Sequence, residues 1–271
     1  MRRHIYARDR KKYPPIDKPK EPGETASAED LKRKMDRSRV ARAVFIQTAS
    51  FYGYDNSYLR DAARAHNRWA RGVVTLRPDD PGQVEFLEDA VRNHNVRGLR
   101  GILDKQKSLS SPAVHRLWRK ARDLGIAVNC FVMDIDRVPD IEAIARALPD
   151  LRIVIDHCFN LNTKTKLEPT LAALKRLSAL PNMHAKLTCG ASGSARRYPH
   201  VDMHDPLKRV IGWFTPDRCV WGSCFPNARW TAGTSYEQNL TLFTHELGLS
   251  KSDKQAILSR TSLRLWFPEE A

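Results

Sequence analysis

Amphipathic segments and short apolar segments alternate along almost the whole chain, and this alternation restricts the possible folds more than any other feature of the sequence. In one unit the amphipathic segment 83–94 precedes the apolar segment 96–103, and in the next the segment 113–124 precedes 127–133. Short segments that are apolar on both faces are typical of parallel strands buried between layers of helices. The alternation therefore predicts an α/β fold with a parallel sheet.

Seven segments have the composition of buried strands, and they lie at 41–48, 72–76, 96–103, 127–133, 151–156, 183–189 and 218–223. An open doubly wound sheet can hold seven strands, but no Gly-x-Gly-x-x-Gly sequence follows the first of them. The N-terminal residues His4, Ile5 and Tyr6 resemble the end of an eighth strand whose beginning is missing. We therefore predict a (β/α)8 TIM barrel with a truncated first strand.

The size and composition of the chain are those of one barrel domain. Its 271 residues, 41% of them hydrophobic, can bury one large core, so we predict a single domain over residues 1–271. Residues 7–27 are rich in Lys, Arg, Pro and Glu without periodicity, which predicts an irregular loop or arm. No segment approaches the roughly 20 apolar residues of a membrane span. The five cysteines include no C-x-x-C pair and are expected to be reduced, so we expect a soluble, cytoplasmic protein.

The formal net charge of +15 raises the question of a nucleic-acid partner. The positive residues, however, are spread over the predicted helix faces, as at Arg116, Arg119 and Lys120, without interleaved aromatic residues. We therefore expect the partner to be a small-molecule substrate, and neither a nucleic acid nor a membrane.

His157 is the most informative polar residue at the end of a predicted strand. Reactive groups of β/α barrels come from the C-terminal ends of the strands, and His157 directly follows the segment 151–156. An imidazole at this place can bind a metal or act as an acid or a base near neutral pH. The alternative is a hydrogen-bonded structural histidine. The barrel context favours the functional role.

Three segments carry a resemblance to a known family: IVIDH at 153–157, AKL at 185–187 and PDRCVWGSCFP at 216–226. They are similar to segments of the amidohydrolase-related barrel family, which includes pyrone-dicarboxylate and sugar lactonases and some decarboxylases. The resemblance covers nearly the whole chain. It implies hydrolysis of a small lactone, cyclic ester or carboxylated metabolite by an activated water.

In metal-dependent members of that family, the ligands are a His-x-His pair on the first strand, a histidine matched here by His157, and an aspartate on the eighth strand. This chain has Arg2 and His4 at the pair and Cys224 at the aspartate. An arginine repels a divalent ion, and a thiol with an ordinary pKa of about 8.5 is mostly neutral at pH 7. Zn²⁺ remains the metal that His4, His157 and Cys224 would suit best, and some lactonases of the family hold no metal tightly.

Three explanations account for these departures. In the first explanation, the start of the chain is assigned too late. In the second, Cys224 has a new role as ligand, base or nucleophile beside His157. In the third explanation the chain is a catalytically silent barrel that binds a small anion or a protein partner. The catalytic candidates under the first two explanations are Cys224 and His157.

The substrate-binding candidates are Arg100 and Ser50. The resemblance implies that Arg100 binds a substrate carboxylate and that Ser50 assists, although Arg100 could instead be a rim arginine and Ser50 could cap a loop.

Other arginines of the dicarboxylate lactonases are replaced here by Gln106 and Ser192, so we do not expect that dicarboxylate as the substrate. Arg196 and Arg197 could supply other anion contacts, or they could be ordinary solvated residues.

Overall fold

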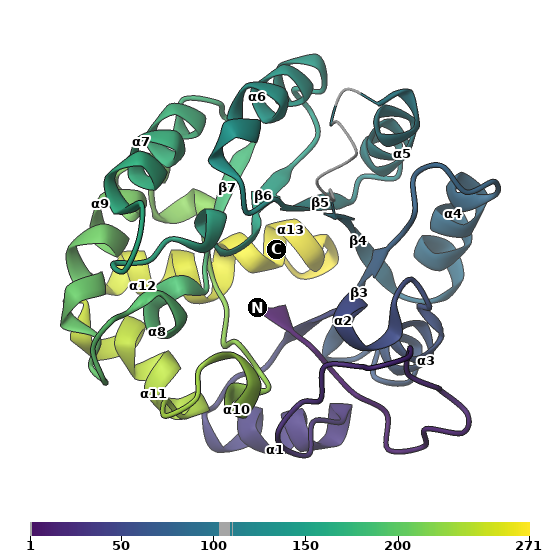
Figure 1. Ribbon diagram of the computed structural model, residues 1–271, viewed down its shortest axis with the longest axis horizontal. Coiled ribbons are helices and arrows are strands. Elements are labelled where there is room, and N and C mark those ends of the chain that lie inside the picture. The colour runs from purple at the N-terminus through teal and green to yellow at the C-terminus, as the bar shows by residue number, and fades with distance from the viewer. Residues whose placement is uncertain (1, 103–108, 110) are drawn as a thin grey trace.

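The computed structural model describes residues 2–102, 109 and 111–271. Eight strands pair in parallel in the order of the sequence, and Figure 1 shows them around a common centre with helices outside. The strands are β1 (Arg2–Arg3), β2 (Ala43–Ile46), β3 (Ala70–Thr75), β4 (Val96–Ile102), β5 (Ala127–Phe131), β6 (Ile153–Ile155), β7 (Met183–Leu187) and β8 (Cys219–Trp221). This arrangement confirms the predicted (β/α)8 barrel.

A backbone hydrogen bond just after the end of β1 links the beginning of the chain to the segment that follows β8. Arg2 and Arg3 pair with Val44 and Phe45 of β2, and the backbone N–H of His4 donates to the carbonyl of Phe225 at 3.1 Å. The predicted eighth strand is therefore present, but it lies at Arg2–Arg3, and His4 follows its end.

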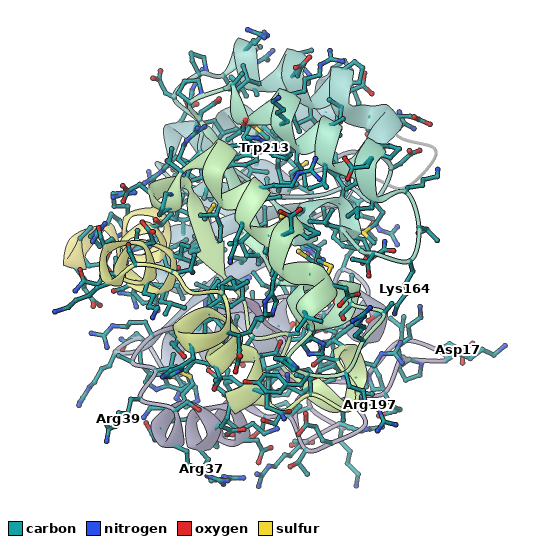
Figure 2. The ribbon with its side chains drawn as sticks, turned by 90° about the vertical axis from the view of Figure 1, so that its left-hand side faces the viewer. Asp17, Arg37, Arg39, Lys164, Arg197 and Trp213 are labelled. Atoms are coloured by element: carbon teal, nitrogen blue, oxygen red, sulfur yellow. The ribbon has the colours of Figure 1, made fainter. Side chains whose placement is uncertain are left out.

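Two cores hold the barrel together. The larger one lies between the strands and the surrounding helices. The smaller one combines inward-facing strand residues with the C-terminal helix α13 (Thr261–Trp266), and its members are Val44, Ile46, Val73, Ala127, Val154, Val220, Leu265, Trp266 and Phe267. Figures 1 and 2 show the yellow C-terminal helices behind the barrel, on the side opposite Lys164 and Arg197. Because these helices cover one end of the barrel, a binding site has to lie at the other end of the barrel.

The long helices lie at the positions that the amphipathic segments predict. They are α1 (Ala28–Arg37), α3 (Ser57–Ala65), α4 (Gln83–Asn93), α5 (Pro112–Asp123), α6 (Val138–Ala147), α7 (Leu167–Ser178) and α9 (His204–Phe214). After β8 the chain forms α11 (Tyr236–Thr241), α12 (Lys251–Gln255) and α13, with one π-helical turn after each of the first two. Among the described residues, no helix is long and apolar enough to cross a membrane.

Three short helices follow strands at the C-terminal end of the barrel, and the sequence pattern did not indicate them. They are α2 (Ala49–Tyr52), α8 (Cys189–Gly193) and α10 (Asn227–Trp230). The prediction that 183–189 is a strand is therefore wrong at Cys189, where α8 begins. Residues 7–27, all of which are described, contain neither helix nor strand.

Candidate active site at the C-terminal end of the barrel

The chain turns sharply after β6. His157, Cys158, Phe159 and Asn160 all have left-handed backbone conformations, with φ between 48° and 57°. A left-handed backbone conformation costs about 1 kcal/mol or more for each residue that is not a glycine. Such conformations concentrate at functional sites. The turn places His157 and Asn160 in the wall of a cavity above the barrel.

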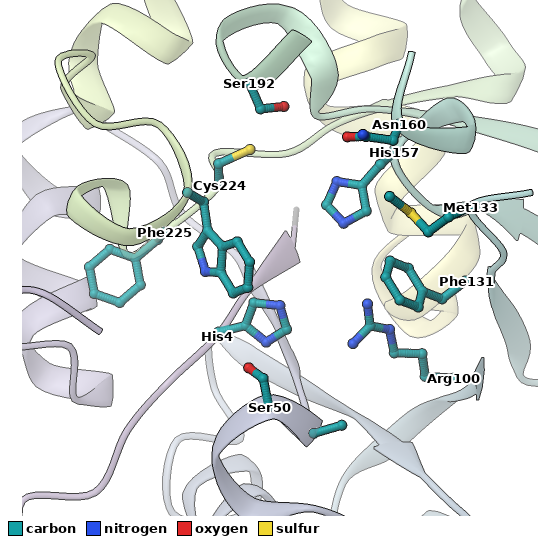
Figure 3. Close-up of a pocket in the computed structure, with 12 residues that line it drawn as sticks. His4, Ser50, Arg100, Phe131, Met133, His157, Asn160, Ser192, Cys224 and Phe225 are labelled. Carbon is teal, nitrogen blue, oxygen red and sulfur yellow. The ribbon is translucent and has the colours of Figure 1, made fainter. Parts of the chain in front are cut away.

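This cavity, of about 300 Å³, contains all five site residues that the sequence indicated (Figure 3). Its walls come from the ends of several strands and from the short helices α2, α8 and α10. The lining residues are His4, Ala49, Ser50, Arg100, Phe131, Met133, His157, Asn160, Ser192, Cys224, Phe225 and Trp230. Apolar and aromatic side chains surround a few polar ones, as is usual for a small-molecule site.

His4 is held in one tautomer. Its Nδ1 lies 3.0 Å from the carbonyl of Ile46 and 3.1 Å from the hydroxyl of Thr48. Because a carbonyl can only accept, Nδ1 must carry a hydrogen. In the neutral ring, Nε2 is then the nitrogen that can take a proton. The indole of Trp230 packs beside this ring, with centroids 5.6 Å apart.

Thr188 connects His157 with Cys224. Its hydroxyl lies 2.6 Å from Nδ1 of His157, and its carbonyl accepts from the thiol of Cys224 at 3.0 Å. Cys224 itself has a left-handed backbone with φ 53° and is buried. The two candidates at the ends of β6 and β8 are thus joined through the residue that follows β7.

A buried charged layer lies below the cavity. The carboxylate of Asp156 accepts from Nζ of Lys186 at 2.6 Å, from Nε of Arg100 at 3.2 Å and from the amide of Asn129 at 3.1 Å. All four side chains are buried, and two cations share one carboxylate. The guanidinium of Arg100 also packs over the ring of Phe131 at 4.1 Å. The layer therefore adds positive charge to the base of the cavity, which favours an anionic ligand.

The residues expected to bind a metal do not form a metal site. His4, His157 and Cys224 line the same cavity, but among the described residues no three His, Cys, Asp or Glu side chains are grouped so that they could hold an ion. The thiol of Cys224 donates to a carbonyl, whereas a zinc ligand must be a thiolate. The cationic Arg100 lines the same cavity and opposes a divalent ion. These contacts do not support the expected zinc site at His4, His157 and Cys224, which stays a prediction.

The structure brings together residues that the sequence indicated separately, and it adds others. Ser192 lines the same cavity, whereas Arg196 and Arg197 line a neighbouring one. Gln106 lies outside the described residues. Sequence reasoning missed the role of Thr188, and it missed the aromatic walls formed by residues such as Trp230. A strand-end position was the only signal for Thr188.

Comparison with known proteins gives a consistent result. Residues 1–267 match the amidohydrolase family. The chain is 31% identical over 213 residues to an L-fucono-1,5-lactonase of Burkholderia ambifaria, covering 74% of this chain and 70% of that protein. It is 26% identical over 273 residues to a 2-pyrone-4,6-dicarboxylate hydrolase of Comamonas testosteroni, covering 96% and 84%.

Solved structures share the fold. One is described as a 2-pyrone-4,6-dicarboxylic acid hydrolase from Pseudomonas putida, with a TM-score of 0.80, 24% identity and coverage of 98% of this chain and 96% of that one. Another is an amidohydrolase from Burkholderia multivorans with zinc bound, with a TM-score of 0.79, 20% identity and coverage of 98% and 97%. At these identities the likeness concerns the fold alone.

Proposed function

Because this chain belongs to the amidohydrolase family, we propose that it hydrolyses a small lactone that carries a carboxylate. The relatives named as lactonases and lactone hydrolases support an enzyme over a silent binding barrel. The observation that carries the proposal is that His4, His157 and Arg100 line one cavity of about 300 Å³. A cavity of this volume suits a single ring with its substituents.

Arg100 is the proposed anchor for the carboxylate of the substrate. Its guanidinium has five N–H donors in a rigid plane, and Asp156 accepts from Nε on one edge. Packing against Phe131 fixes the plane of the group. Ser50 lines the same cavity and offers a hydroxyl for a second hydrogen bond. The anchored carboxylate determines which way the lactone ring faces.

His4 is the proposed general base. With Nδ1–H donating to the carbonyl of Ile46, Nε2 accepts a proton from a water as the water oxygen bonds to the lactone carbonyl carbon. His157 is the proposed donor to the carbonyl oxygen, with the hydroxyl of Thr188 donating to Nδ1 and Nε2 carrying the hydrogen. When the ring C–O bond breaks, the leaving alkoxide takes the proton from His4, and the new carboxylic acid releases its own proton to solvent.

Cys224 is not the proposed base or nucleophile. Its thiol donates to the carbonyl of Thr188. A thiolate at the same position would be repelled by the partial negative charge of that carbonyl oxygen. We propose that Cys224 supports Thr188 and leaves the wall of the cavity uncharged. The donor set does not suit a divalent ion, so the proposed reaction contains no metal step.

The test is turnover of a panel of carboxylated and sugar lactones by the purified chain, with His4→Asn and Arg100→Met as variants. Asparagine keeps a donor near the carbonyl of Ile46 but has no basic nitrogen, so we expect kcat to fall by about 10²-fold or more with an unchanged melting temperature. Arg100→Met should mainly raise KM. Absence of turnover of every lactone by the wild-type chain would refute the proposal.

A further inference from the structure

A second cavity, of about 610 Å³, adjoins the proposed reaction cavity. The two have a common wall, because Ser192 and Trp230 line both. Of the two cavities, Lys164, Arg196 and Arg197 line only the second, and none of the described residues that line it is an Asp or a Glu. Figure 2 shows Lys164 and Arg197 on the same side of the molecule, which is the end of the barrel that carries the reaction cavity.

The loop that carries the arginines is anchored at several points. Asp202 accepts from the hydroxyl of Ser194 and from the backbone N–H of Ala195, and a network of this kind fixes the start of the loop. Nδ1 of His200 lies 2.9 Å from the carbonyl of Arg196, and its Nε2 lies 3.1 Å from the hydroxyl of Thr234. The buried His200 therefore ties the loop to Thr234, which also lines the cavity.

The cationic side chains of this cavity differ from isolated surface charges. Exposed lysines and arginines on protein surfaces are usually solvated individually or paired with a carboxylate. Here three cationic side chains line one hollow, and the nearby carboxylate of Asp202 accepts hydrogen bonds from Thr163, Ser194 and Ala195. A ligand group with several acceptor oxygens matches such a set of donors.

We infer that the second cavity binds a distal anionic group of the substrate, such as a phosphate, sulfonate or carboxylate, while the lactone ring occupies the reaction cavity. This inference rests on the proposed function and extends it, because it assigns the substrate two separate anionic groups. Arg100 binds the one close to the ring, and Arg196, Arg197 and Lys164 bind the other. Ser192 and Trp230 line both cavities, so the substrate would run past these two residues from one cavity to the other.

The test compares two lactones that differ only in a distal phosphate, using the double variant Arg196→Gln/Arg197→Gln. Both arginines are exposed, so the fold should be unaffected. The control Lys208→Gln/Lys251→Gln removes the same charge from exposed positions that line neither cavity. We expect KM for the phosphorylated lactone to rise about tenfold or more in the arginine variant only, as for loss of one or two charge-assisted hydrogen bonds. An equal change for both lactones, or no change, would overturn the inference.

A binding measurement separates this inference from the proposed function. The probe is 4-phosphoerythronate, an open-chain acid with a carboxylate at one end and a phosphate at the other, measured by titration calorimetry. Weaker binding to the arginine variant than to the lysine control supports the second site even if no lactone is hydrolysed. Equal binding to both variants counts against it even if lactones are hydrolysed. Sulfonate and carboxylate analogues of the probe then identify the preferred anion.

Discussion

Nζ of Lys186 lies 2.6 Å from Oδ1 of Asp156, and both side chains are completely buried inside the barrel. Removing one partner of such a pair leaves a buried charge without its main compensation. We therefore expect Lys186→Met to lower the free energy of unfolding by about 3–5 kcal/mol, measured by urea denaturation.

A double-mutant cycle checks this interaction. The variant Lys186→Met/Asp156→Asn removes both charges, so it should be less destabilised than the sum of the two single variants. Asp156 also accepts from Arg100, so some loss should remain in the double variant. Additive effects of the two substitutions would show that the pair is not coupled.

The strands were predictable because the feature that defines them lies within a short stretch of sequence. Segments such as Ile153–Ile155 are buried on both faces, and they therefore appear in the sequence as short, continuous apolar runs. The short helix Cys189–Gly193 could not be predicted, since five residues form less than two turns and show no helical periodicity. Its two glycines, Gly190 and Gly193, also disfavour a helix.

The site was predictable only in part. His157 and Cys224 stand at strand ends, where barrels carry reactive groups, and both line the cavity. The left-handed run from His157 to Asn160 contains no glycine, so the sequence carried no sign of it. The link through Thr188 depends on three neighbouring strands meeting in space, which no local pattern encodes.

Thr188→Val tests the link between the two strand ends. Valine has the shape of threonine and retains the backbone carbonyl that accepts from Cys224, but it lacks the hydroxyl near His157. Because that hydroxyl sets the orientation and tautomer of the ring, we expect kcat to fall by about 10- to 100-fold with little change in KM. Steady-state kinetics provide the measurement. Thr188→Ser, which retains a hydroxyl, should recover most of the activity, and equal loss in both variants would contradict the role of the hydroxyl.

Cys224→Ser distinguishes a supporting thiol from a nucleophile. The serine hydroxyl can donate to the carbonyl of Thr188 in place of the thiol, so we expect kcat to change by no more than about threefold, the effect of one neutral hydrogen bond of altered length. Single-turnover kinetics and mass spectrometry of the quenched enzyme provide the measurement. A covalent acyl adduct on Cys224 would show that the sulfur attacks the substrate. Complete inactivation by serine with the fold intact would contradict the supporting role and show that the thiol takes part in the reaction.

Chelation tests the absence of a metal step. Since Cys224 donates its proton to a carbonyl and Arg100 lines the same cavity, added zinc should find no complete set of ligands. We expect activity to be unchanged after dialysis against a chelator, and substoichiometric zinc by elemental analysis. Loss of activity on chelation with recovery on adding Zn²⁺ would contradict the proposed reaction and favour His4, His157 and Cys224 as ligands.

His184 lines neither of the two cavities, but it makes stability depend on pH. Burial lowers the pKa of His184 to about 4, and the nearby positive charges of Arg218, Arg152 and Arg264 act in the same direction. Its Nδ1 lies 3.2 Å from the carbonyl of Asn182. The folded chain therefore prefers the neutral ring.

The unfolded chain binds this proton more readily than the folded chain, because the pKa of His184 is near 6.5 when exposed and about 4 when folded. The stability that the neutral ring contributes is thus present above pH 6.5 and is lost as the pH falls from 6.5 to 4, by about 3 kcal/mol in total. His184→Leu should lower stability at pH 7 through imperfect packing but should flatten this part of the profile. The measurement is urea denaturation of the wild type and of His184→Leu from pH 7.5 to 4. The difference between their free energies of unfolding isolates His184, because the carboxylate titrations that both proteins share cancel. Parallel profiles would show that His184 is not the titrating group.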